Sequence, residues 1–397
     1  MPLFENAYRR RVTLTYFLAF VAIGLTGGLL GPALPHLAEL TGAGMSQIAL
    51  LFTARALGNM LGSVSVGVLV DRLPGHPVLM LMVVLMVLAL ALAPLSPSLA
   101  VLIGVIFVMG FAEVAINAGS NTLLLWTHRQ AAGPYISALH FCFALGNMLA
   151  PLVLVAALQW SGRFEWAFWG VGLYALTLLA WLRRDPTPRP PEASPEAAPG
   201  DATTARPRRG DASLLGTLML LFSLYVGAEI TFAGWITAYA VLQGEPRESA
   251  ALLVTLFWLA LSAGRLLAIP LLRLISPWWL LLGCLGLGLA SALAMPWLPL
   301  WPIALGYGLA ASAIFPTLFG LCNRLMTMSG KRTGLIFLAS GLGAMLVPSL
   351  TGPLLERAGT AAFPWLLATL MGLLLLGVAI LRRLTRTRGD HDMPHAR

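Results

Sequence analysis

The chain has 397 residues, of which 58% are hydrophobic and only 10% are charged. Ordinary globular proteins carry about 25% charged residues, and so few charges would leave much of a soluble surface of this size uncovered. The composition therefore excludes a soluble multidomain protein and predicts an integral membrane protein with many spans.

The formal net charge of +9 does not indicate a nucleic-acid partner, because the basic residues flank alternate ends of the apolar runs. That is the positive-inside pattern, and it points to anionic lipid in place of nucleic acid. The residues concerned are Arg9, Arg10, Arg11, Arg72, Arg129, Arg183, Arg184, Arg273, Arg324, Lys331, Arg332, Arg382 and Arg383. The opposite loops hold Arg163, Arg247 and Arg357. We therefore expect a multi-pass protein of the plasma (inner) membrane with both termini in the cytoplasm.

Twelve runs are long enough to cross about 30 Å of hydrocarbon. They cover residues 12–34, 46–70, 77–95, 98–126, 132–158, 165–182, 213–242, 249–272, 277–295, 299–323, 333–355 and 361–381. The pattern predicts an all-α membrane protein with twelve transmembrane helices in two pseudo-symmetric six-helix bundles.

The expected domains are an N-terminal bundle (1–182), a cytoplasmic linker (183–211), a C-terminal bundle (212–383) and a cytoplasmic tail (384–397). The linker is rich in Pro, Ala and charged residues, which cannot form a core. The motif L-G-x-M-L-x-P occurs at residues 145–151 and again at 342–348, in the fifth and eleventh runs. This repetition is what a duplicated six-helix unit predicts.

The fourth run contains an acid in an otherwise apolar stretch. Glu113, Asn117 and Asn121 are four residues apart and share one stripe of a helix. A charge at the bilayer centre costs roughly 2.5–3.5 kcal/mol on insertion scales, so it tends to face a cavity or a partner. We interpret this stripe as one wall of a substrate path.

Few other charges lie in the middle of a run. Of sixteen acids, only Glu113 and Glu229 do so, together with the bases Arg55 and Arg265. Each acid is either a coupling-ion site or half of a structural ion pair, and both interpretations remain open. Arg55 and Arg265 are expected to be structural partners of these acids.

The end of the second run carries a known motif. Residues 67–77 read GVLVDRLPGHP, with Gly67, Asp71 and Arg72 in the pattern. This stretch resembles the G-x-L-x-D-R-x-G loop of the major facilitator superfamily. The resemblance implies a transporter fold made of two repeated halves and a gating or structural role for these three residues.

Two finer resemblances concern function. Glu113-x-x-x-Asn117 is similar to a motif of the fucose permease type of sugar/proton symporters, which implies a protonation site at Glu113 beside a sugar path. One polar position of that family's fifth span falls on His140. The segments GPALPHL, R-x-x-G-x-x-x-G-S from Arg55, and Tyr225 to Tyr239 resemble the sodium-dependent glucose transporter branch.

Several aromatic residues lie away from the ends of the runs, notably Trp235, Tyr239 and Trp258. Aromatic rings stack on the apolar faces of sugars, although packing within the bundle explains any single ring equally well. We expect a substrate site formed by Asn117, Asn121, His140, Trp235, Tyr239 and Trp258.

The sequence predicts a secondary transporter and not an enzyme. The sequence contains no dinucleotide, P-loop or zinc-protease motif in the structural setting that such a motif requires. No cofactor is therefore expected. No metal is expected either, apart from Na⁺ as a possible coupling ion. We predict alternating access for a small polar solute, a monosaccharide, coupled to H⁺ or Na⁺ through Glu113, Glu229 and His140. A proton-coupled drug antiporter is the second hypothesis. A monomer is expected.

Overall fold

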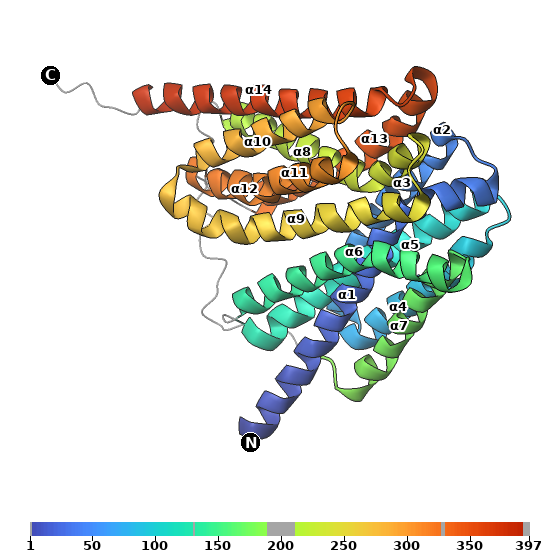
Figure 1. Ribbon diagram of the computed structural model, residues 1–397. Helices are drawn as coiled ribbons and strands as arrows, with labels where there is room; N and C mark the ends of the chain where they lie inside the picture. Colours follow the sequence, from blue (N-terminus) through green and yellow to red (C-terminus); the bar gives the residue numbers. More distant parts are fainter. Residues whose placement is uncertain (1, 130–131, 189–210, 327–329, 392–397) are drawn as a thin grey trace. The chain divides into compact units, whose positions relative to one another are not determined.

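The computed structural model describes residues 2–129, 132–188, 211–326 and 330–391, and each long apolar run forms helix (Figure 1). The first half contains α1 (Pro2–Thr41), α2 (Met45–Ile48), α3 (Leu50–Arg72), α4 (Gly75–Leu92), α5 (Leu99–His128), α6 (Ala132–Ser161) and α7 (Glu165–Arg184). The second half contains α8 (Asp211–Leu242), α9 (Arg247–Leu274), α10 (Pro277–Ala294), α11 (Leu300–Ser312), α12 (Ile314–Leu325), α13 (Gly330–Ala358) and α14 (Ala362–His391). A short 3₁₀ turn follows α4.

Membrane-crossing length is confirmed for most of the predicted spans. Within the described ranges, 11 helices are long and apolar enough to cross a membrane. The second predicted span is α3, which has 23 residues but is not among these 11. Including α3, the helices reproduce the twelve predicted runs in order.

Two predicted spans are interrupted. The tenth, expected over residues 299–323, breaks at Ala313 between α11 and α12. Pro316 has no N–H to donate to the carbonyl four residues earlier, so a continuous helix loses a hydrogen bond at this point. The second, expected over 46–70, begins as the four-residue α2 and continues as α3 after Ala49.

The chain divides into two compact units. Unit 1 comprises Met1–Glu192, Ala233–Trp258 and Ser349–Thr360, and unit 2 comprises Ala193–Phe232, Leu259–Pro348 and Ala361–Arg397. Parts of α8, α9 and α13 are therefore grouped with the first half of the chain.

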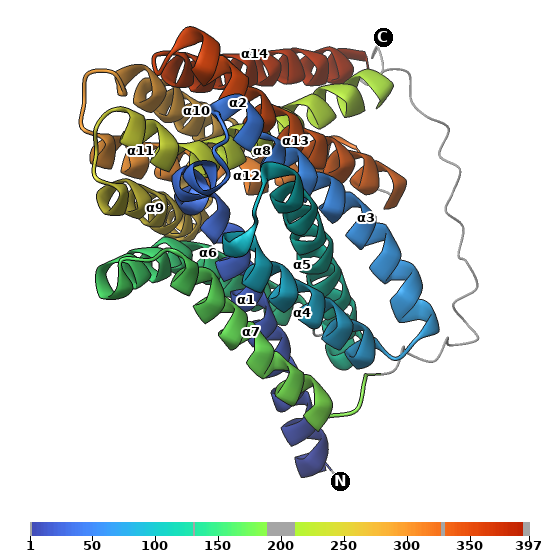
Figure 2. The same cartoon turned by 90° about the vertical axis from the view of Figure 1, so that its right-hand side faces the viewer.

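Glycines set the helix packing in unit 1, where α3 lies along α5 and α1 lies along α6 (Figure 2). Side chains added at Gly58 or Gly62 of α3 would meet the backbone of α5, and one added at Gly110 would meet the backbone of α3. Gly24 and Gly146 are in similar contact between α1 and α6. Small residues let helix backbones approach closely in a membrane, where van der Waals packing drives association.

Within unit 1, the segment after α7 is bound to α1. Asp185 accepts hydrogen bonds from Arg11 at 2.7–3.1 Å, and the Pro186 carbonyl accepts one from Tyr8 at 2.9 Å. The linker was expected from residue 183. Arg183 and Arg184 belong to α7, residues 185–188 form this docked strap, and 189–210 lie outside the described residues.

In unit 2, α10 packs against α11, α12 and α14. The first part of α8 contributes Phe222, whose ring meets Phe315 of α12 edge-on at 5.0 Å. Toward the C-terminal end of α14, Arg382 lies over the Trp279 ring of α10 at 5.9 Å. Helix α14 continues to His391.

Candidate functional site

A buried ion pair joins α3 and α5 in unit 1. The Arg55 Nε and Nη2 atoms donate to Glu113 Oε2 at 2.9 and 2.8 Å. Glu113 is 5% exposed, and the guanidinium also donates through Nη1 to the Gly27 carbonyl of α1 at 3.3 Å. Three helices therefore converge on this charge pair.

The two oxygens of the Glu113 carboxyl differ. Oε2 receives both Arg55 hydrogen bonds, whereas Oε1 is buried and has no hydrogen-bond partner among the atoms the structure describes. A buried carboxylate oxygen without a donor is costly. It is therefore a position where a proton, a cation or a ligand hydroxyl would be stabilised.

Glycines at helix contacts make room for the Arg55–Glu113 pair. Gly110 precedes Glu113 by three residues and packs on the backbone of Arg55, which brings the two helices close enough for the pair to form. A side chain at Gly27 would occupy the place of the Arg55 guanidinium. Sequence analysis did not identify Gly27 as a partner of Arg55, because that contact depends on how two separate helices pack.

The two asparagines continue the stripe along α5. Asn121 Nδ2 donates to the Asn117 carbonyl at 3.0 Å and to Asn117 Oδ1 at 3.1 Å, and both side chains are partly buried. Four residues of helix rise about 6 Å. The amides therefore lie about one and two turns beyond the ion pair, toward the end of α5.

Two of the predicted aromatic residues lie toward the other end of unit 1. Trp235 is fully buried, with its ring 5.8 Å from Phe52 of α3, and Tyr239 accepts a hydrogen bond from Gln243 at 3.3 Å. Phe52 precedes Arg55 by three residues. Along α3 and α5, the ion pair thus lies between the Trp235–Phe52 contact and the two asparagines.

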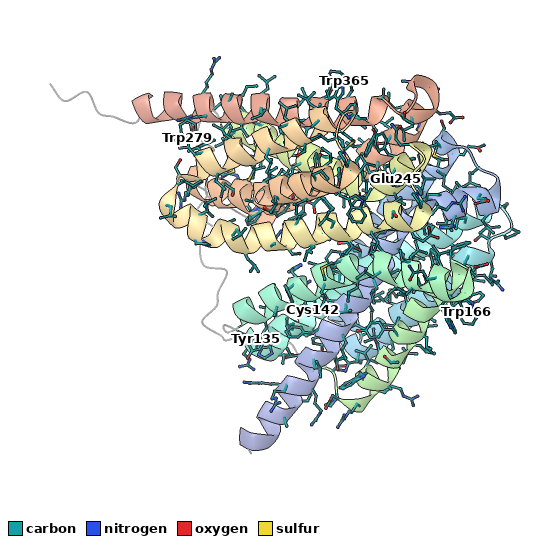
Figure 3. All side chains as sticks on the ribbon, viewed as in Figure 1. Tyr135, Cys142, Trp166, Glu245, Trp279 and Trp365 are labelled. Carbon is teal, nitrogen blue, oxygen red and sulfur yellow. The ribbon has the colours of Figure 1, made fainter. Side chains whose placement is uncertain are left out.

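His140 and Trp258 contact residues other than those around the Arg55–Glu113 pair. His140 of α6 is exposed, and its ring meets Phe20 of α1 edge-on at 5.7 Å. Figure 3 labels Tyr135 and Cys142 on the same helix, on either side of His140 in sequence. Trp258 is buried against Phe257, with the ring centroids 5.3 Å apart.

Glu229 forms a separate cluster in unit 2. The Tyr225 hydroxyl donates to the Ala311 carbonyl at 2.9 Å and lies within hydrogen-bonding reach of Glu229 and Arg265. Arg265 is close enough for its charge to act on Glu229. The second acid, like Glu113, therefore has an arginine in its own unit.

The structure describes only part of the G-x-L-x-D-R-x-G-like motif at the end of α3. Gly67 and Asp71 belong to α3, but their surroundings are outside what the structure describes, and Arg72 is exposed in the last turn. His76, just beyond, is buried. Its Nδ1 lies 2.9 Å from the Asp185 carbonyl, and its Nε2 lies 2.9 Å from the Tyr16 hydroxyl. This histidine therefore ties the start of α4 to α1 and to the strap.

The relatives of this chain include proteins named as glucose transporters. It is 28% identical over 384 residues to sodium-dependent glucose transporter 1A of Mus musculus, covering 85% of this chain and 88% of that protein. It is 30% identical over 375 residues to sodium-dependent glucose transporter 1 of Rattus norvegicus, covering 84% and 77%. It is also 27% identical to a TsgA homologue of Erwinia tasmaniensis, covering 88% and 90%.

Solved structures share the fold. The D-xylose–proton symporter superposes with a TM-score of 0.73 at 15% identity, covering 95% of this chain and 97% of that one. The nucleoside transporter NupG gives 0.71 at 14% identity, covering 95% and 98%. The model of the Major Facilitator Superfamily matches residues 16–348. The chain is thus a transporter and not an enzyme, and it belongs to the major facilitator superfamily.

Proposed function

We propose that this protein is a secondary active transporter that moves a monosaccharide by alternating access, with H⁺ or Na⁺ as the coupling ion. Relatives named sodium-dependent glucose transporter 1 in mouse and rat, aligned over most of both chains, support the substrate class. The solved D-xylose–proton symporter, at 15% identity, supports the fold alone.

The observation that carries the proposal is the position of Glu113 Oε1. This oxygen is buried without a hydrogen-bond donor among the described residues, on the helix stripe that continues to Asn117 and Asn121. The Arg55 guanidinium favours the charged form of the Glu113 carboxyl through Oε2, and the second oxygen, Oε1, has no donor among the described residues. A cation or proton bound at Oε1 would compete with Arg55 for the carboxylate. Ion binding would then alter the contact that holds α3, α5 and α1 together.

The sugar is proposed to bind beside this pair. Asn117 and Asn121 supply amide donors and acceptors for hydroxyl groups. In the proposed cycle, two six-helix bundles rock around a central site, with His140, Trp235, Tyr239 and Trp258 contributing as expected from the sequence. Glu229 with Arg265 is proposed as a second coupling position.

The test is uptake of labelled hexoses into proteoliposomes with separate Na⁺ and H⁺ gradients. Glu113→Gln removes the charge and keeps the shape, so we expect loss of gradient-driven accumulation while sugar counterflow continues. Glu165→Gln is the matched control, because Glu165 lies at the start of α7 and pairs with the exposed Arg163 at 3.2 Å. Full accumulation by Glu113→Gln would refute the coupling role.

The same vesicles separate the sugar hypothesis from drug/proton antiport. The drug antiporters carry a Gly-rich fifth-span motif ending in Gly-Pro, whereas this chain has Leu149-Ala150-Pro151. Extrusion of a cationic dye on imposing a pH gradient, with no hexose uptake under either gradient, would favour antiport and overturn the proposed substrate class.

A further inference from the structure

A cavity of about 380 Å³ lies at the end of unit 1 where α1 begins and α5 ends. It is lined by Tyr8, Arg9, Trp126, Thr127, Arg129, Pro186, Thr187 and Pro188. None of these residues belongs to the proposed transport site, and the basic residues of this end predict that it faces the cytoplasm.

The walls of the cavity are held in place by specific contacts. The strap after α7 is fixed by the bidentate Arg11–Asp185 pair, with Nε on Oδ2 and Nη2 on Oδ1, and by the hydrogen bond from Tyr8 to the Pro186 carbonyl. The Thr187 hydroxyl accepts from the backbone N–H of His76 at 3.1 Å. Prolines at 186 and 188 further restrict the backbone of the strap. This wall of the cavity is therefore held in a defined conformation.

The end of α5 is fixed as well. His128 lies 2.6 Å from the Thr13 hydroxyl through Nε2 and stacks on Tyr135 of α6 with 3.7 Å between ring centroids. Arg129 caps the helix with a φ of 51°, in the left-handed region that non-glycine residues seldom adopt. Arg129 lines the cavity together with Trp126.

The charge of the cavity is positive. Arg9 and Arg129 are both exposed side chains, and the strap acid Asp185 is buried and neutralised by Arg11. Two guanidinium groups beside an indole match a phosphate group at the membrane surface. Arginine binds phosphate with paired N–H donors, and tryptophan favours the headgroup region of a bilayer.

We propose that this cavity binds the phosphate of an anionic lipid from the cytoplasmic leaflet, with Arg9 and Arg129 as its ligands. Basic pockets between membrane helices are suited to such headgroups. The bound lipid would bridge the beginning of α1, the end of α5 and the strap. This inference does not depend on which solute is transported.

The experiment measures binding of labelled phosphatidylglycerol to the full chain in neutral detergent micelles, with native mass spectrometry to count retained lipids. One near-surface basic residue contributes roughly a fivefold gain in affinity for anionic lipid. We therefore expect Arg9→Gln/Arg129→Gln to weaken binding about 25-fold. Arg9→Lys/Arg129→Lys keeps the charge and should lose much less.

The matched control is Arg10→Gln/Arg183→Gln, which removes the same charge from exposed residues at the same end that do not line the cavity. Equal weakening in both double variants would mean diffuse surface attraction and would overturn the proposal. Competition with glycerol phosphate tests whether a soluble phosphate compound occupies the cavity in place of the lipid. Displacement of the lipid by equimolar glycerol phosphate would overturn the lipid as the source of the phosphate. Size-exclusion profiles and melting temperatures verify that each variant is folded.

Discussion

At the scale of single residues, the Arg55–Glu113 pair combines two properties. Its geometry is that of a strong charge-assisted contact, with two N–H donors on one oxygen, yet the other oxygen is open among the described atoms. A purely structural pair would gain stability from satisfying both oxygens. The half-satisfied carboxyl is therefore consistent with the proposed exchange of a proton or cation at Oε1.

The stability of this pair is testable by substitution. Arg55→Met leaves Glu113 as a buried charge without its partner, which costs roughly 3–5 kcal/mol. We expect a clear fall in the thermal unfolding midpoint measured in detergent. Arg55→Met/Glu113→Met replaces both charges with apolar groups and should recover most of the loss.

The control for this cycle is Arg163→Met, which breaks the exposed pair with Glu165. Surface pairs contribute about 0–1 kcal/mol, so little change is expected. If the double variant melts as low as Arg55→Met alone, the loss does not come from an unpaired Glu113, and the energetic account of the pair fails.

At the scale of helices, close contact between α3 and α5 positions the pair. A methyl group at Gly110 would collide with the backbone at Arg55, whereas one at Gly104 of the same helix meets no atom within 4 Å. The two glycines have the same chemistry and the same helical setting, but only Gly110 lies in the helix contact.

These glycines therefore give a matched pair of variants. Gly110→Ala forces α3 and α5 apart, and overpacking of this kind costs roughly 1–3 kcal/mol, so both the melting temperature and hexose uptake should fall. Gly104→Ala should be neutral or slightly stabilising, because alanine favours a helix over glycine by roughly 0.5–1 kcal/mol. Identical melting of the two variants would show that close packing at Gly110 does not position the pair.

Sequence patterns predicted the helices well but not their interruptions. The tenth span breaks near Pro316, yet α1 continues through Pro32 and Pro35 and α6 continues through Pro151. A proline in an apolar run therefore does not decide between a kink and a break. Neighbouring helices that satisfy the freed backbone groups decide it, and a single sequence does not reveal them.

The same limit applies to the candidate site. The sequence contained two acids and two bases in the middle of runs, which allows Arg55 to pair with either acid. Helix spacing predicted that Glu113, Asn117 and Asn121 share a stripe, but the partner of each acid depends on contacts between helices. The structure pairs Arg55 with Glu113 in unit 1 and places Arg265 near Glu229 in unit 2.

At the scale of the whole molecule, unit 1 contains segments from both halves of the chain. Arg247 forms an ion pair with Glu39 at 2.7 Å, and Glu356 accepts from the backbone N–H of Ser46 at 2.9 Å. These contacts link α1, α2, α9 and α13 at the end of unit 1 opposite the N-terminus. Alternating access requires that such contacts between first-half and second-half helices break and re-form in each cycle.

Thr53 of α3 and Ser349 of α13 provide a way to test this requirement, because their hydroxyl oxygens are 2.6 Å apart. In Thr53→Cys/Ser349→Cys, the two sulfurs would be close enough for a disulfide. Oxidation should then hold α3 against α13 and stop net hexose uptake, and a reducing agent should restore it, because the helices must separate to release substrate on one side. Each single cysteine variant serves as the control, since it retains Cys142, Cys284 and Cys322 but has no new partner. Uptake that continues at the full rate, with the cross-link demonstrated by mass spectrometry of the peptides, would show that this contact stays closed throughout transport. The opening would then have to occur elsewhere, and the requirement that this contact between first-half and second-half helices breaks in each cycle would be wrong.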